Sequence, residues 1–111
     1  MSTSSDDEME ENPTVISQIE DFHTFNINYE ETKKTYKTRP YLDKYEKTAV
    51  ISERAQQLAN GGQPLLKNPE SYNTVYEIAL EELRQKKIPY IIHRPSSNGS
   101  EYWKLADLKM L

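Results

Sequence analysis

The segregation of charge along the chain is the feature that most constrains its fold. Residues 1–32 contain nine acidic residues and no lysine or arginine, whereas residues 33–111 contain the other nine acids and all fourteen bases. The net charges are therefore −9 and +5, against −4 for the whole chain. An acidic segment with few apolar residues cannot bury enough surface to offset the entropy of ordering. We expect a disordered acidic tail at 1–32 and a folded domain at 33–111.

The bulk composition restricts the class of protein. A chain of 111 residues has room for one small domain, and its mean hydropathy of −0.90 indicates a thin core. There is no cysteine for a disulfide or a metal site, and the histidines, His23 and His93, fall in segments of opposite character. No apolar run approaches the roughly 18 residues of a membrane span, and the polar start is unlike a signal peptide. We expect a soluble intracellular protein without cofactor, metal or membrane partner.

A first helix is predicted at residues 44–60. Asp43 and Glu46 have the spacing of a capping box, in which each side chain bonds the backbone N–H of the other residue. Gly61 and Gly62 provide a stop signal at the other end. Apolar residues at spacings of three and four predict a buried face consisting of Tyr45, Ala49, Ile51, Ala55, Leu58 and Ala59.

A second helix and a hairpin complete the expected domain. Thr74 and Glu77 form another capping box, so a helix should run to about Lys87, where Pro89 prevents its continuation. Its expected buried face consists of Val75, Ile78, Ala79, Leu80 and Leu83. The β-branched YIIHR and the aromatic EYWKL flank an Asn-Gly turn and predict two strands. The fold class is therefore α+β, small and mainly helical: two helices with an intervening loop, then a C-terminal β-hairpin, after a disordered acidic tail.

Catalysis is a poor fit to the residues, because no nucleophile with a base, phosphate-binding glycine loop or ligand cluster is present in the sequence. Nucleic-acid binding is the stronger alternative. Six basic residues alternate with tyrosines between Lys33 and Lys47, a pattern that can contact phosphates and stack on bases. The adjacent acidic tail would compete with nucleic acid for this patch, so a protein-binding surface is favoured.

Three stretches in this order resemble one known family. They are TRPYLDKYEKTAVISERAQQL, IALEELRQKKIPYIIHR and NGSEYW, which lie within residues 38–108. The chain is similar there to the small subunit shared by the nuclear RNA polymerases, the counterpart of archaeal subunit K and bacterial omega. RAQQL followed by a glycine-containing loop looks more like the versions carried by large DNA viruses.

The resemblance implies a non-catalytic subunit of DNA-directed RNA polymerase. Such a subunit latches the largest subunit and supports assembly and stability, while nucleotidyl transfer belongs to the two large subunits and DNA is met only through the complex. A cellular version would be nuclear, and a viral one would work in the virion or in a cytoplasmic virus factory. The residues expected to contact the largest subunit are Arg39, Pro40, Tyr41, Tyr45, Glu46, Arg54, Pro89 and Arg94.

The tail has separate expectations. Ser4 and Ser5 each precede an acid by three residues, the spacing that acid-directed kinases prefer, so both are candidate phosphorylation sites. The tail is also a candidate segment for binding a transcription factor. Two alternatives to a polymerase subunit stay open at this point: a free-standing transcription regulator that uses the tail, and a small nucleic-acid-binding protein that uses the basic stretch.

Overall fold

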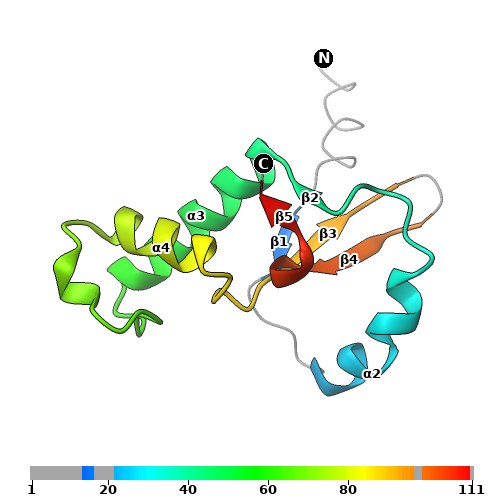
Figure 1. Ribbon diagram of the computed structural model, residues 1–111, viewed down its shortest axis with the longest axis horizontal. Coiled ribbons are helices and arrows are strands. Elements are labelled where there is room, and N and C mark those ends of the chain that lie inside the picture. The colour runs from blue at the N-terminus through cyan, green and yellow to red at the C-terminus, as the bar shows by residue number, and fades with distance from the viewer. Residues whose placement is uncertain (1–13, 17–21, 97–98, 111) are drawn as a thin grey trace, which may run out of the picture.

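Two helices and a β-hairpin form the body of the fold, as the sequence predicts. The computed structural model describes residues 14–16, 22–96 and 99–110. The two helices lie side by side, and the hairpin lies beyond one end of the pair (Figure 1). In chain order, the elements of this body are α3 (Lys44–Ala59), α4 (Val75–Arg84), β3 (Ile91–Arg94) and β4 (Glu101–Lys104).

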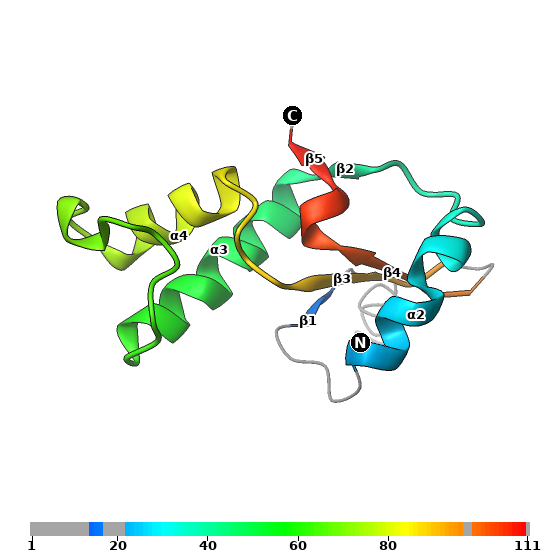
Figure 2. The same ribbon diagram turned by 60° about the horizontal axis from the view of Figure 1, so that its bottom comes forward.

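The strands form two small sheets. β1 (Thr14–Ile16) joins the hairpin on its β3 side, giving the antiparallel order β1–β3–β4. β2 (Tyr41–Leu42) and β5 (Lys109–Met110) form a separate parallel pair. Figure 2 shows this pair beside the start of α3, so the last strand returns to the segment that precedes the first long helix.

The capping box of α3 is complete, which confirms the predicted start. The Asp43 carboxylate accepts a hydrogen bond from the Glu46 amide at 2.7 Å, and the Asp43 amide donates to Glu46 Oε1 at 3.2 Å. α3 ends at Ala59, and Gly61 follows with a φ of 99°, a left-handed conformation that glycine adopts without strain. The two glycines therefore stop the helix where the sequence indicates.

The predicted buried face of α3 is wrong for three of its six residues. Ile51 and Leu58 are buried as expected and Ala55 is half-buried, but Ala49 and Ala59 are exposed and Tyr45 is 74% exposed. The residues that face the core are Glu46, Val50, Ile51, Arg54 and Leu58. The prediction used apolar residues alone and so left out Glu46 and Arg54, which lie on the inner face. Both can be buried because each pairs with an opposite charge elsewhere in the fold.

α4 follows its prediction more closely. Ile78, Ala79 and Leu83 are buried as expected, whereas Leu80 is 38% exposed and Glu82 is buried in its place. α4 ends at Arg84, three residues before the predicted end. The reason is Lys86, whose φ of 59° reverses the chain while the Lys87 amide bonds the carbonyl of Glu82.

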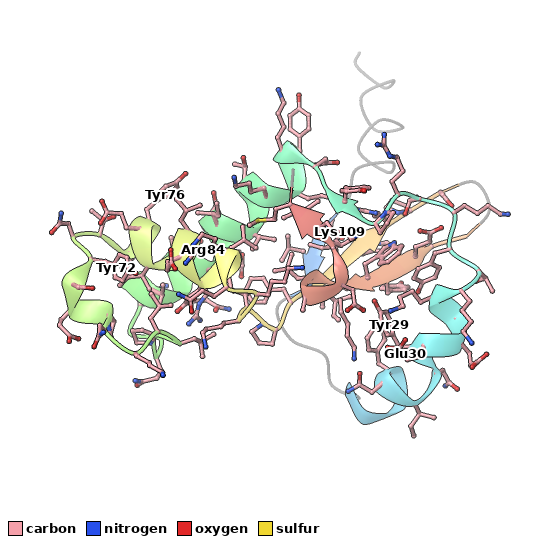
Figure 3. All side chains as sticks on the ribbon, viewed as in Figure 1. Tyr29, Glu30, Tyr72, Tyr76, Arg84 and Lys109 are labelled. Carbon is pink, nitrogen blue, oxygen red and sulfur yellow. The ribbon has the colours of Figure 1, made fainter. Side chains whose placement is uncertain are left out.

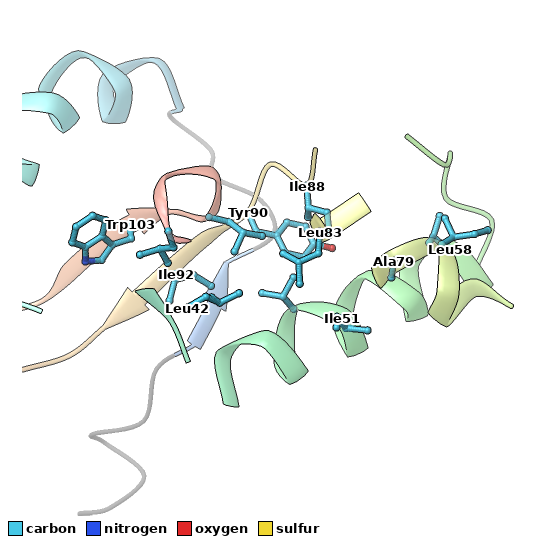
Figure 4. Packing of buried hydrophobic residues seen from close by; sticks show 13 residues of the cluster. Leu42, Ile51, Leu58, Ala79, Leu83, Ile88, Tyr90, Ile92 and Trp103 are labelled. Atoms are coloured by element: carbon cyan, nitrogen blue, oxygen red, sulfur yellow. The ribbon is translucent and has the colours of Figure 1, made fainter. Parts of the chain in front are cut away.

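The core runs from the helix pair into the sheet. Figure 4 shows Leu58 and Ala79 between the helices, with Ile51 and Leu83 leading to Ile92 and Trp103 on the hairpin. Ile92 is fully buried and is paired with Trp103 across the hairpin and with Val15 of β1 on its other side. The hairpin is thus fixed to the helices by continuous apolar packing.

Two elements lie in the segment that we expected to be disordered, namely β1 and α2 (Phe22–Lys33). α2 is held by Tyr29, which is 2% exposed and donates its hydroxyl to Asp107 Oδ2 at 2.7 Å. The same hydroxyl accepts from the Lys104 amide at 3.1 Å. Figure 3 shows Tyr29 projecting from α2 towards the C-terminal part of the chain. This tie spans 78 residues, so no local pattern could reveal it. The other residues of the predicted tail, 1–13 and 17–21, lie outside the described residues.

The Tyr29 tie gives a first prediction. Tyr29→Phe removes the hydroxyl and with it the hydrogen bonds to Asp107 and from the Lys104 amide, so the free energy of unfolding should fall by about 1–2 kcal/mol. Amide hydrogen exchange should quicken across α2 before it quickens in α3. Ile27→Ala, a change at a 63% exposed position of the same helix, is the control and should stay within about 0.5 kcal/mol of the parent. Equal effects of the two changes in urea titrations would contradict the tie.

Candidate partner-binding site

The segment that leads into α3 is fixed from beneath by Arg94. Its guanidinium donates to the carbonyls of Arg39 at 2.7 Å and Tyr41 at 2.8 Å. It also forms a two-pronged ion pair with Glu46, with both N···O distances at 2.8 Å. Thr38 Oγ1 accepts a further bond at 3.0 Å. Arg94 and Glu46 are both buried, so all five guanidinium contacts are made inside the protein.

A second buried side chain, Glu101 at the start of β4, holds the residues just upstream. Its carboxylate accepts from the Lys37 amide at 2.7 Å, from Thr38 Oγ1 at 2.5 Å and from Trp103 Nε1 at 3.1 Å. Burial acts to raise the pKa of the Glu101 carboxyl, but the hydrogen bonds from Thr38, Lys37 and Trp103 outweigh it, so the pKa lies below its ordinary value. The carboxylate is therefore held in its charged form.

With their backbone fixed, the lead-in residues direct several side chains outward. Arg39 and Pro40 are exposed, and Tyr41 is half-buried between two cations. The Arg39 guanidinium lies 5.7 Å and the Lys109 ammonium 6.0 Å from the centre of the Tyr41 ring. Lys44 lies 5.5 Å from the Tyr45 ring in the same manner. We call this set the lead-in surface: Arg39, Pro40, Tyr41, Lys44, Tyr45 and Lys109.

Two adjoining hollows lie beside the lead-in surface. The first, of about 430 Å³, is lined by Thr14, Val15, Asp43, Tyr45, Glu46, Ala49 and Ile92. The second, of about 360 Å³, is lined by Thr38, Arg39, Tyr41, Asp43, Glu46, Arg94 and Pro95. Both include Asp43 and Glu46, so the hollows meet at the start of α3. Aromatic rings beside shallow hollows, with cations around them, are the composition expected of a protein-binding surface.

A second buried ion pair stabilises the helix pair instead of the lead-in surface. Arg54 Nε donates to Glu82 Oε1 at 2.5 Å, which joins α3 to α4. Arg54 also donates to the carbonyl of Gln63 at 2.8 Å, and Glu82 Oε2 accepts from the Leu65 amide at 2.7 Å. The pair thus holds the interhelical loop against both helices, and Arg54 is only 7% exposed.

The eight residues expected to contact a partner therefore separate into three groups. Arg39, Pro40, Tyr41 and Tyr45 lie together on the lead-in surface. Glu46, Arg54 and Arg94 point inward and form ion pairs that position the surface or the helices. Pro89 is exposed between α4 and β3, away from the lead-in hollows. Ser4 and Ser5 lie outside the described residues.

Sequence reasoning missed several residues that build this site. Glu101 and Lys109 depend on the return of the C-terminal strands to residues 37–42, and nothing in their neighbourhood signals it. Glu82 is absent from the predicted buried face of α4, although an acid within an apolar stretch of the helix was the available signal. The His93 ring contacts Thr14 Oγ1 at 3.3 Å and Ser100 Oγ at 2.9 Å, neither of which its sequence neighbours indicate.

Neither a metal site nor a membrane-spanning helix accompanies the lead-in surface in the described part of the chain. Across residues 14–16, 22–96 and 99–110, histidine and carboxylate side chains form no group of three or more that could hold a metal ion. Among these residues there is also no helix with the length and apolar character needed to cross a membrane. The lead-in surface is thus the best-defined candidate site in the described structure.

The region of the chain that is similar to known proteins includes the lead-in surface around residues 39–45. The family described as RNA polymerase Rpb6 matches residues 37–90, from the lead-in to the residue before β3. The chain is 38% identical over 77 residues to the RPABC2 subunit of DNA-directed RNA polymerases I, II and III of Schizosaccharomyces pombe, covering 68% of this chain and 54% of that protein. The chain belongs to the RNA polymerase Rpb6 family.

Other relatives in the Rpb6 family carry similar names. A probable RPABC2 subunit of Caenorhabditis elegans is 34% identical over 92 residues, covering 82% of this chain and 66% of that protein. RPABC2 of Saccharomyces cerevisiae is 36% identical over 72 residues, covering 64% of this chain and 46% of that protein. The chain thus spans about half to two thirds of the length of these curated relatives. The Rpb6 match includes Arg39, Tyr41 and Tyr45, but Arg94 and Glu101, which bond the backbone of the lead-in, lie beyond it.

Replacing Arg94 tests the support of the lead-in surface. Arg94→Met leaves the buried carboxylate of Glu46 without its charged partner and removes the donors to the carbonyls of Arg39 and Tyr41, so the free energy of unfolding should fall by about 3–5 kcal/mol. The double change Arg94→Met with Glu46→Leu removes the unpaired charge and should recover part of this loss. Urea titrations compare the variants. If the double variant is no more stable than Arg94→Met, the loss of stability does not come from the unpaired charge of Glu46.

The depressed carboxyl pKa values predict acid sensitivity. Burial acts to raise the pKa of Asp107, but the hydrogen bonds from Tyr29 and Lys33 lower it by more than burial raises it. The pKa of Asp107, like that of Glu101, therefore lies below its ordinary value. The unfolded chain therefore binds these protons at higher pH than the folded one. Their contribution to stability is full above the ordinary values of 4.5 and 3.8 and is lost as the pH falls through the lower folded values.

Glu101→Gln isolates this effect. The variant should be less stable than the parent at pH 7, because an amide NH₂ would face donors from Thr38 and Trp103. Its stability should also fall less between pH 7 and pH 3, since one of the carboxyls with a lowered pKa is gone. Urea midpoints measured across this range provide the test, and an unchanged pH dependence would count against the role of Glu101.

Proposed function

We propose that this chain is a non-catalytic subunit of a DNA-directed RNA polymerase that binds the largest subunit through the lead-in surface. The names of the relatives support the polymerase, since each is a subunit of such an enzyme. The assignment of the binding surface rests on the structure. Arg94 and Glu101 fix the backbone of residues 37–41 and leave the side chains of Arg39, Tyr41 and Tyr45 directed outward.

The fixed backbone favours binding by reducing its entropic cost. A flexible segment must lose backbone and side-chain freedom when it docks, at about 0.5–1.5 kcal/mol for each immobilised side chain. Residues 37–41 have already lost much of this freedom, because their amides and carbonyls are bonded to buried Glu101 and Arg94. Their large rings then supply apolar contact area with polar edges, as at other protein interfaces.

The charges of the lead-in surface favour a partner of a particular chemistry. Arg39, Lys44 and Lys109 place three exposed cations around Tyr41 and Tyr45. A complementary surface would carry carboxylates at its rim and apolar side chains that enter the two hollows. The part of the largest subunit that binds here should therefore be acidic around an apolar centre.

The remaining parts of the proposal follow from the resemblance to the shared subunit of the nuclear polymerases. The active site would lie in the two large subunits, and DNA would be met only through the complex. The cell nucleus is the proposed location. A version carried by a large DNA virus would instead work in the virion or in the cytoplasmic virus factory of its host. A transcription factor is a candidate partner of the acidic tail.

Capture by the largest subunit tests the proposal. The double variant Arg39→Ala with Tyr45→Ala should be captured about tenfold more weakly than the parent, because it loses a cation and an aromatic anchor. Its stability should be nearly unchanged, since both side chains are exposed. The control is Tyr76→Ala, which removes a 56% exposed ring from α4 (Figure 3) and should be captured normally.

Two results would contradict the proposal at different levels. Normal capture of the lead-in variant together with poor capture of Tyr76→Ala would move the interface to the helix pair. Failure of the tagged parent chain to co-purify with any polymerase subunit from its native source would reject the polymerase assignment itself.

A further inference from the structure

The lead-in surface carries cations without matching carboxylates. Within residues 14–16, 22–96 and 99–110, no carboxylate forms a salt bridge with Arg39, Lys44 or Lys109. The exposed Asp43 is nearby, but its carboxylate is used as the cap of α3, and the charge of Glu46 is neutralised by Arg94. The surface therefore presents a net positive charge to whatever lies over the two hollows.

β1 brings the acidic N-terminal segment to this same surface. β1 is antiparallel to β3 and Thr14 is paired with His93, so the N-terminal end of β1 lies at the Arg94 end of β3. Thr14 also lines the first hollow, and Arg94 and Pro95 line the second, which contains Arg39 and Tyr41. The chain upstream of Thr14 thus starts at the edge of the hollows.

The length and charge of the upstream chain fit the surface. Five acids occur within residues 6–11, namely Asp6, Asp7, Glu8, Glu10 and Glu11. At about 3.3 Å for each residue, Glu11 can lie no more than about 10 Å from Thr14 and Asp6 no more than about 27 Å. A short tether of this kind raises the effective concentration of the acids at the surface into the millimolar range. A contact too weak to form between separate molecules would then be populated within one chain.

We propose that residues 6–11 of this chain occupy the hollows over the lead-in surface and cover it until a partner displaces them. The acids would lie near Arg39, Lys44 and Lys109, and the acidic partner would bind by exchange with them. Phosphates, including those of nucleic acid, would meet a surface already neutralised. This inference concerns the chain before assembly and goes beyond the proposed function, so it can fail or hold whichever polymerase subunit binds here.

Paramagnetic relaxation tests the proposal on the full chain. The sequence contains no cysteine, so Ser4→Cys provides a single site for a nitroxide label next to the acidic residues. The label should broaden the amide signals of residues 39–47 at least about threefold more than those of residues 64–72, and 1 M salt should reduce this difference to the part that the covalent tether alone produces. A difference that 1 M salt leaves unchanged would come from the tether alone and would overturn the proposal. Equal broadening of the two groups would overturn the proposal.

Matched charge variants identify the surface that is involved. Lys44→Glu with Lys109→Glu should reduce the selective broadening to the level seen in 1 M salt. Lys67→Glu with Lys87→Glu changes the net charge equally at the far loop and beyond the end of α4, and should leave the broadening as in the parent. The opposite pattern would place the acids elsewhere. Broadening that appears in an unlabelled isotope-enriched chain mixed with a labelled one would show that a second copy is the occupant and would also overturn the proposal.

Competition with a defined anion gives an independent readout. In a tail-neutralised chain, residues 6–11 keep their length but carry Asp6→Asn, Asp7→Asn, Glu8→Gln, Glu10→Gln and Glu11→Gln. A duplex DNA oligonucleotide should bind this chain about tenfold more tightly than the parent at low salt, because nothing then competes for the cations. Equal binding by the two chains would show that the tail leaves the surface open.

Discussion

The guanidinium of Arg94 connects three parts of the chain that are far apart in sequence. It belongs to β3, it pairs with Glu46 of α3, and it donates to the backbone of residues 39 and 41. Burying an arginine without a partner has a large desolvation cost. A buried ion pair offsets that cost only when the remaining N–H donors of the arginine are also hydrogen-bonded. Here the donors that Glu46 does not use are taken by carbonyl groups of the lead-in and by Thr38. The requirement to satisfy one charged group therefore determines where the lead-in lies.

The same logic recurs at the other end of the fold. Arg54 pairs with Glu82 between the helices, and their spare hydrogen-bonding groups bind the loop at Gln63 and Leu65. In both places a buried charge pair fixes a segment of irregular backbone. Apolar packing cannot do this, because the amides and carbonyls of a loop need hydrogen-bond partners. The small core orients helices and hairpin, while the charge pairs set the segments between them. This division explains how a chain of low mean hydropathy retains a defined surface.

Sequence reasoning succeeded where local chemistry decides the outcome. The capping box at Asp43, the glycine stop at Gly61 and the β-branched run before Arg94 each depend on neighbouring residues, and each is where it was expected. The inner face of α3 failed because Glu46 and Arg54 were read as surface charges, and their partners lie 48 and 28 residues away. The prediction that Tyr29 lies in a disordered tail was wrong for the same reason, because its partner Asp107 lies 78 residues away. Of the candidate site, the sequence indicated the four residues that lie on the lead-in surface, whose contact with a partner stays a prediction. It did not indicate Glu101, which bonds the backbone just upstream of them, at Lys37, from 64 residues away.

The return of β5 to β2 has a consequence for the timing of folding. Tyr41 and Leu42 pair with Lys109 and Met110, and the Lys109 amide bonds the carbonyl of Pro40. During synthesis the lead-in leaves the ribosome long before Arg94, Glu101 and these last residues do. While the chain is incomplete, the lead-in therefore lacks its buried donors and acceptors, and its tyrosines have no fixed position. Until those residues are in place, a protein that contacts the lead-in surface would meet a flexible segment and would have to order it on binding.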